Sequence, residues 1–153
     1  MSNYDALKLE NQLCFPLYAA AKEVVRQYRP LLDELDLTYT QYIVMMYFWE
    51  NKESNVKDLG KRLLLDSSTL TPLLKKLENK GYIERKRSSI DERNLIVKLT
   101  SKGENLRDDA LDIPKRIGKC INLNDEEALT LYSIVYKVLA NIEEDFNGNN
   151  WSK

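Results

Sequence analysis

A stripe of four leucines constrains the fold of this chain more than any other feature. The spacing i, i+3, i+4 and i+7, which marks one buried helix face, is filled by Leu70, Leu73, Leu74 and Leu77. Asn79-Lys80-Gly81 follows and predicts a glycine cap at the end of this helix. Two short strands are predicted next, at 82–87 and 94–99, joined by a polar turn.

A second, shorter helix is predicted just before the leucine stripe. Asn55 is a suitable N-cap, and Val56, Leu59 and Leu63 follow at helical spacing. A turn at 65–67 then leads into the striped helix. The order of helix, turn, helix and basic hairpin predicts a winged helix-turn-helix over about residues 55–100, whose second helix enters the DNA major groove.

Helical segments flank this module on both sides. We expect a helix from about Asp5 to Tyr28, with Pro16 marking a kink or a start and Arg29-Pro30 ending it. Thr38 is a plausible N-cap for a helix over 39–50.

Two further helices are expected after the hairpin. Thr100-Ser101, with Glu104 in a capping-box pattern, begins one that accommodates Pro114 and ends near Cys120. Asn124 caps the last one, which runs toward Phe146.

The expected fold class is mainly α with a small β-wing, in one protomer spanning residues 1–153. Residues of about 5–50 and 101–146 would form a helical dimerisation scaffold, because their apolar content exceeds what one small winged domain can bury.

Composition excludes several classes of function. The chain has no histidine, two cysteines and five glycines. These counts leave no Ser-His-Asp or Cys-His catalytic set, no imidazole or all-thiolate metal site and no glycine-rich phosphate loop. We therefore expect no enzyme activity, no cofactor and no metal.

The hydropathy pattern contains no apolar run of about 18 residues, so no membrane span is expected. The N-terminus lacks a basic stretch followed by an apolar one, which indicates no secretory signal. Together with the low cysteine count, this favours a cytoplasmic location.

Charge is distributed unevenly although the net charge is only −1. Residues 55–103 hold 12 Lys and Arg against 6 Asp and Glu, whereas the remainder is acidic. A basic module on an acidic frame is typical of a nucleic-acid-binding protein, although solvated faces also carry charge.

The outer face of the striped helix and the hairpin carry hydroxyls and cations suited to phosphate oxygens and base edges. An exposed helix of soluble residues is the alternative reading of the same pattern. The predicted DNA contacts are Ser67, Ser68, Thr69, Thr71, Lys75, Lys76, Arg85, Lys86, Arg87, Asp91 and Arg93.

Cys14 is the residue best suited to redox chemistry. On one helix, Cys14, Tyr18 and Tyr28 fall within about 80° of arc, and Tyr39 begins the next helix. A phenol can donate a hydrogen bond to a thiolate and so favour it. The alternative is that Cys14 is a small buried residue in an aromatic core.

Three motifs together resemble the MarR family of dimeric winged-helix regulators. They are the segment 66–78, the Gly81-Tyr82-Ile83 turn, and Asp91-Glu92-Arg93-Asn94, which carries the family's Asp-x-Arg wing pattern. Leu99-Thr100-x-x-Gly103 matches the family's exit from the wing. The resemblance covers nearly the whole chain.

Within that family, the N-terminal segment 9–15 resembles OhrR-type organic-peroxide sensors, as do segments 28–32 and 37–42. The resemblance implies that Cys14 is the reactive thiol and that Tyr28 and Tyr39 reach it from the partner subunit. It also implies that Cys120 is a possible resolving thiol for the oxidised Cys14.

The implied function is that of a homodimeric repressor bound to double-stranded operator DNA. It would be released when an organic hydroperoxide oxidises Cys14 to a sulfenic acid, which then forms a disulfide with Cys120 or a low-molecular-weight thiol. A regulator that binds a small aromatic ligand, with Cys14 outside redox chemistry, is the main alternative. A thiol peroxidase is disfavoured because no histidine or evident arginine activates the thiol.

Overall fold

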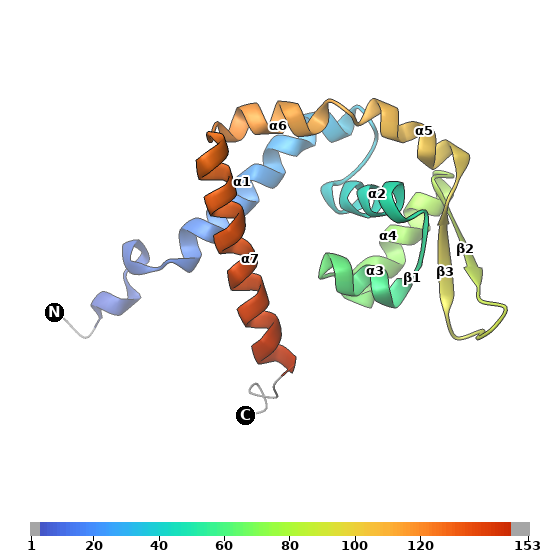
Figure 1. The fold of residues 1–153 in the computed structure, drawn as a ribbon, viewed down its shortest axis with the longest axis horizontal. Coiled ribbons are helices and arrows are strands. Elements are labelled where there is room, and N and C mark those ends of the chain that lie inside the picture. Colours follow the sequence, from blue (N-terminus) through green and yellow to red (C-terminus); the bar gives the residue numbers. More distant parts are fainter. Residues whose placement is uncertain (1–3, 148–153) are drawn as a thin grey trace. The chain divides into compact units, whose positions relative to one another are not determined.

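The computed structural model describes residues 4–147 (Figure 1). Their side chains are described as far as residue 143. The chain divides into two compact units, Met1–Ile117 and Gly118–Lys153, which are described separately. The described residues confirm the expected class, mainly α with a small β-wing. The elements are α1 (Cys14–Asp33), α2 (Tyr39–Asn51), β1 (Glu53–Asn55), α3 (Val56–Leu63), α4 (Ser67–Asn79), β2 (Ile83–Arg87), β3 (Leu95–Leu99), α5 (Ser101–Asp109), α6 (Ile113–Ile121) and α7 (Asp125–Asn147).

The first helix begins and ends later than predicted. Two 3₁₀ turns, Asp5–Leu7 and Leu9–Asn11, precede α1, which begins at Cys14. Pro16 therefore lies in the first turn, where a backbone N–H has no helical partner to lose. The predicted break at Arg29-Pro30 is wrong, because α1 continues through Pro30 to Asp33.

Pro30 is tolerated because the residues that follow it contribute to the core. Pro30 is exposed, whereas Leu31 and Leu32 are buried. Burying each leucine contributes about 1.5–3 kcal/mol, which offsets the one backbone hydrogen bond that proline cannot make.

Helix α2 is the centre of the core and begins as predicted. Thr38 caps it in a capping box, in which the Gln41 N–H donates to the Thr38 hydroxyl and the Gln41 side chain accepts from the Thr38 N–H. Val44, Met45 and Phe48 are fully buried along α2.

The helix-turn-helix follows the predicted pattern. Asn55 caps α3 by accepting from the Asp58 N–H at 2.8 Å. The helices α3 and α4 pack closely at Gly60, where an added Cβ would lie 3.0 Å from Leu70 Cδ1 of α4 and 2.7 Å from the Leu65 carbonyl oxygen in the turn. The predicted stripe is buried throughout, at Leu70, Leu73, Leu74 and Leu77.

The wing is an antiparallel sheet of order β1-β3-β2. Arg85 pairs with Val97, whose side chain is fully buried, and Ile83 pairs with Leu99. Strand β1 was not predicted, because three residues are too few to show a period-two pattern. Gly81, with φ of +79°, makes the turn from α4 into the sheet, as its predicted cap position requires.

The region after the wing differs from the prediction of one helix. It forms α5 and α6, and Pro114 lies in the first turn of α6. Thr100 is the N-cap of α5 and accepts from the Gly103 N–H at 3.0 Å. The predicted capping box is wrong, because the Glu104 carboxylate pairs with Lys52 instead.

The second unit holds the last helix, α7. Asn124 and Glu127 form a reciprocal cap at its start, as the Asn124 N-cap predicts, with hydrogen bonds of 2.9 and 3.0 Å. Large apolar side chains are exposed along α7 within this unit, among them Leu131, Ile134 and Tyr136. In residues 4–147, every helix falls short of the length or apolarity that crossing a membrane requires.

Candidate functional site

The thiol of Cys14 lies at the first residue of α1 and is exposed. Tyr18, one helical turn further on, is 64% exposed. Within one protomer, Cys14 is therefore not a buried core residue, contrary to the alternative reading. An accessible thiol beside an accessible phenol suits a reaction with a small oxidant.

Tyr28 and Tyr39 belong to a separate aromatic cluster between α1 and α2. Their ring centroids lie 4.9 Å apart, and the ring of Tyr42 lies 5.8 Å from that of Tyr28. Tyr42 is only 2% exposed and was missed from the sequence, where a tyrosine inside an apolar helix looks like ordinary core packing.

Burial changes the acid–base behaviour of this cluster. Burial, and then the neighbouring phenols Tyr28 and Tyr39, raise the pKa of Tyr42 to about 12. Burial also raises the pKa of Tyr28 and of Tyr39. All three hydroxyls therefore stay protonated at neutral pH and can act as hydrogen-bond donors.

A single chain does not bring Cys14 to this cluster. Tyr28 lies fourteen positions after Cys14 along α1, a rise of about 21 Å. The predicted ring of phenols around the thiol is therefore not formed within one protomer, apart from the proximity of Tyr18.

Cys120 lies near the end of α6 and is exposed. It belongs to the second unit, whereas Cys14 belongs to the first. Its predicted role as a resolving thiol stays a prediction.

The predicted DNA-contacting face of α4 is exposed. It comprises Ser67, Ser68, Thr69, Thr71, Lys75 and Lys76. The buried leucine stripe lies on the opposite side of the same helix. This arrangement presents hydroxyls and ammonium groups on a helix that the core holds firmly.

The start of α4 is organised by Asp66. Its carboxylate accepts from the Ser68 hydroxyl at 2.6 Å and from the Thr69 N–H at 2.7 Å, and these hydrogen bonds lower the pKa of Asp66. The Thr71 hydroxyl donates to the Ser67 carbonyl at 2.8 Å. With their protons engaged, the Ser68 and Thr71 hydroxyls keep lone pairs free to accept from donors such as base amino groups.

The tip of the wing is held by Asp91. Its carboxylate accepts from the backbone N–H of Arg93 at 3.0 Å and also lies 3.5 Å from the Asn94 side-chain amide. Asp91 therefore holds the backbone of Arg93 and leaves its guanidinium to other partners. The exposed guanidinium of Arg93 is thus presented from an ordered turn.

Lys86 and Arg87 are exposed on β2, as predicted, whereas Arg85 is partly buried and paired with Glu78. A groove of about 480 Å³ lies between the helix-turn-helix and the wing. Its cationic lining residues are Lys57, Lys61, Arg85 and Arg93.

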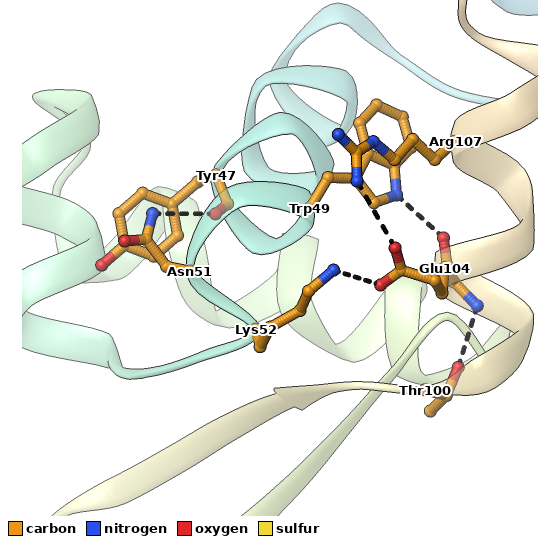
Figure 2. A network of polar contacts seen from close by, with 8 residues as sticks. Tyr47, Trp49, Asn51, Lys52, Thr100, Glu104 and Arg107 are labelled. Atoms are coloured by element: carbon orange, nitrogen blue, oxygen red, sulfur yellow. Dashed lines mark hydrogen bonds and ion pairs between the residues drawn. The ribbon is translucent and has the colours of Figure 1, made fainter.

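A polar network joins the end of α2 to α5 and the wing (Figure 2). The Lys52 ammonium contacts the Glu104 carboxylate at 2.5 Å, and the Leu99 N–H donates to the Lys52 carbonyl at 2.8 Å. The Trp49 indole N–H donates to the Gly103 carbonyl at 2.8 Å. The C-terminal end of α2, the helix that carries Tyr39 and Tyr42, is therefore hydrogen-bonded to β3, the last strand of the wing.

Comparison with known proteins agrees with this geometry. The sequence profile of the SarA/Rot transcriptional regulators matches residues 26–110. The organic hydroperoxide resistance transcriptional regulator of Bacillus subtilis is 44% identical over 143 residues, covering 94% of this chain and 97% of that protein. The HTH-type transcriptional regulator SarZ of Staphylococcus saprophyticus is 46% identical over 123 residues, covering 80% of this chain and 84% of that protein.

Among solved structures, reduced AbfR bound to DNA is similar with a TM-score of 0.74 and 31% identity, over 90% of this chain and 96% of that chain. AbfR, a protein of Staphylococcus epidermidis, has also been solved in an overoxidised form bound to DNA and in a disulfide form.

Proposed function

Because this chain belongs to the SarA/Rot family of winged-helix transcriptional regulators, we propose that it is a redox-sensing repressor that organic hydroperoxides release from operator DNA. The observation that carries the proposal is the exposed Cys14 at the first residue of α1, in a chain 44% identical to an organic hydroperoxide resistance regulator. A regulator of this kind acts on the chromosome, which places it in the cytoplasm.

The DNA-binding state is a homodimer on a pseudo-palindromic site. Residues of about 5–50 and 101–146 form its dimerisation scaffold, and residues of about 55–100 form each DNA-binding module. The exposed face of α4 enters the major groove, and Arg93 enters the minor groove from the wing. The exposed apolar side chains of α7 support a scaffold role, because a helix face of that kind is covered in a stable assembly.

The sensing step is the oxidation of the Cys14 thiolate. Its sulfur attacks the outer oxygen of the hydroperoxide, the O–O bond breaks, and the leaving alkoxide takes a proton and departs as an alcohol. The sulfur retains a hydroxyl group as a sulfenic acid. Tyr18, and the partner subunit's Tyr28 and Tyr39, donate hydrogen bonds to the thiolate.

The releasing step is disulfide formation. A second thiol, from Cys120 or from a low-molecular-weight thiol, attacks the sulfenic sulfur and expels water. AbfR was solved on DNA in both its reduced and its overoxidised states. This supports disulfide formation, and not oxidation of the sulfur alone, as the step that releases DNA. A disulfide imposes a covalent constraint that a change of oxidation state at one sulfur does not.

The test uses the reduced protein and a DNA duplex that it selects from a random pool. Fluorescence anisotropy follows the complex during addition of cumene hydroperoxide, with and without a thiol, and then after dithiothreitol. The wild type is expected to release DNA and to rebind it on reduction. Cys14→Ser is expected to bind the same duplex and to ignore the oxidant. Release of DNA from Cys14→Ser would contradict the sensor assignment. A wild type that holds DNA in the oxidant would favour the small-ligand alternative.

A further inference from the structure

The junction between the recognition helix α4 and strand β2 is held by one carboxylate. Glu78 lies in the last turn of α4, and Arg85 lies in the middle of β2. The turn between them is tight, with the Gly81 N–H donating to the Glu78 carbonyl at 2.8 Å and the Tyr82 N–H to the Leu77 carbonyl at 3.1 Å.

Glu78 makes three contacts with Arg85. Its Oε1 accepts from the Arg85 backbone N–H at 3.0 Å, and its Oε2 accepts from Arg85 Nε at 2.9 Å and lies 2.8 Å from Nη2. The Glu78 side chain is 34% exposed and the Arg85 side chain 21%, whereas the neighbouring Lys86 side chain is 75% exposed. The hydrogen bonds from Arg85 lower the pKa of Glu78, so the carboxylate is ionised at neutral pH.

The backbone contact has a structural reason. Strand β2 is at the edge of the sheet, with β3 on one side only. Because the Ser88 N–H donates to Asn94 on the β3 side, alternation directs the Arg85 N–H away from β3. An edge N–H of this kind needs another acceptor, and Glu78 supplies it from the recognition helix.

We propose that Arg85 is a positioning residue for DNA binding, acting through Glu78, and not a direct DNA contact. The clamp formed by Glu78 and Arg85 fixes the angle between α4 and the wing, so that the α4 face and Arg93 engage one duplex together. The inference rests on the proposed function.

For Glu78→Gln, charge alone and the clamp predict opposite changes in DNA affinity. Replacing Glu78 with glutamine removes a negative charge from a basic DNA-binding module, which by charge alone strengthens binding to a polyanion. If Arg85 were a phosphate contact, loss of its partner would also release it toward DNA. The clamp predicts weaker binding instead, because the wing loses its fixed orientation.

The experiment measures the affinity of full-length reduced variants for a duplex that the wild type selects from a random pool. Glu78→Gln and Arg85→Gln are each expected to weaken binding about tenfold, and the double variant is expected to be no weaker than Arg85→Gln, because both changes break one unit. Arg85→Lys keeps the positive charge but loses the guanidinium, whose two nitrogens contact Glu78. It is therefore expected to weaken DNA binding while the salt dependence of the affinity stays unchanged. Glu84→Gln, an exposed carboxylate on the same strand, is the charge-matched control and is expected to bind as well as the wild type or better.

Hydroxyl-radical footprinting separates loss of orientation from loss of folding. The clamp variants are expected to lose protection under the wing while keeping it under α4, and circular dichroism checks that each variant is folded. The inference is overturned if Glu78→Gln binds as tightly as the wild type. It is also overturned if Arg85→Gln alone weakens binding and lowers the salt slope by about one, which indicates a phosphate contact. A wild type that selects no duplex overturns the proposed function, and the inference with it.

Discussion

The indole N–H of Trp49 donates a buried 2.8 Å hydrogen bond to the carbonyl oxygen of Gly103, across 54 residues of sequence (Figure 2). This bond ties α2 to the first turn of α5, directly after the wing ends. We expect Trp49→Phe to lower the free energy of unfolding by about 1–3 kcal/mol, because the interhelical hydrogen bond is lost and the smaller ring leaves space in the core. Urea denaturation followed by circular dichroism measures the loss. An unchanged midpoint would show that the bond contributes nothing to stability.

Gly103 itself provides a second, sharper test of the same junction. A Cβ at this position would lie 2.1 Å from the Tyr82 carbonyl oxygen and 2.7 Å from Leu99 Cδ1. We expect Gly103→Ala to destabilise the protein by about 3 kcal/mol, because the crowding atom is backbone and cannot turn aside. Gly118→Ala is the control, since nothing lies within 4 Å of its Cβ position and alanine favours the helix by about 0.5–1 kcal/mol. Thermal melts of the two variants are expected to shift in opposite directions.

The buried Tyr42 predicts a stability change at alkaline pH. Its pKa is about 12, above the ordinary value of 10.0, so the folded state holds the phenolic proton more tightly than the unfolded state. A raised pKa contributes stability that is fully present below pH 10 and is lost as the pH rises toward 12. We expect the urea midpoint to fall across that window, and to fall less in Tyr42→Phe. An equal fall in both proteins would remove Tyr42 as the cause.

Arg93 is expected to be the main wing contact with DNA. Its exposed guanidinium extends from a turn that the Asp91 carboxylate holds, and a narrow minor groove attracts such a group. Arg93→Ala is expected to weaken binding about tenfold or more in fluorescence anisotropy. Asp91→Ala is expected to weaken it less, even though it removes a negative charge, because the turn loosens. Glu92→Ala is the adjacent exposed control, and a loss there equal to that of Arg93→Ala would refute a specific contact.

The tyrosine cluster is expected to influence the rate of thiol oxidation. Tyr28→Phe and Tyr39→Phe each remove one protonated donor and little volume, so both variants are expected to fold. Stopped-flow measurement of Cys14 oxidation is expected to show a roughly tenfold slower reaction, because hydrogen bonds to a charged group are worth more than neutral ones. Tyr47→Phe is the control, since that hydroxyl donates to Ser54, 3.1 Å away. Normal rates in both cluster variants would assign Tyr28 and Tyr39 to core packing alone.

Sequence reasoning succeeded where a local pattern has a direct physical cause. The leucine spacing of α4 and the caps at Thr38, Asn55 and Asn124 each predict an element through a short-range hydrogen bond or a helical period. The break predicted at Pro30 failed because a tertiary term, the burial of Leu31 and Leu32, outweighs a local preference.

The contacts that sequence reasoning missed connect residues on different elements. Glu78 and Arg85 are joined across a turn, and Lys52 meets Glu104 across 52 positions, so neither pair has a periodic signature. Tyr42 was missed for a different reason, since its phenol is distinguished only by its depth in the fold.

Cys120 is expected to decide how the oxidised thiol is resolved. Its thiol is exposed near the end of α6, where a second thiol can reach it. A disulfide requires its two Cα atoms to come within about 7 Å, and a bridge to Cys14 of the partner subunit produces a covalent dimer.

Non-reducing electrophoresis after one equivalent of cumene hydroperoxide tests this bridge. The expected result is a dimer-sized band in the wild type that is absent from both Cys14→Ser and Cys120→Ser. The Cys120→Ser protein is then expected to release DNA only when a small thiol is supplied, because it lacks the resolving thiol. If Cys120→Ser forms the same band and releases DNA as the wild type does, Cys120 is a spectator and the chain is a one-cysteine sensor. Mass spectrometry of the oxidised wild type identifies whether Cys14 is linked to Cys120 or to Cys14 of the partner subunit. Only the second bridge can form in Cys120→Ser.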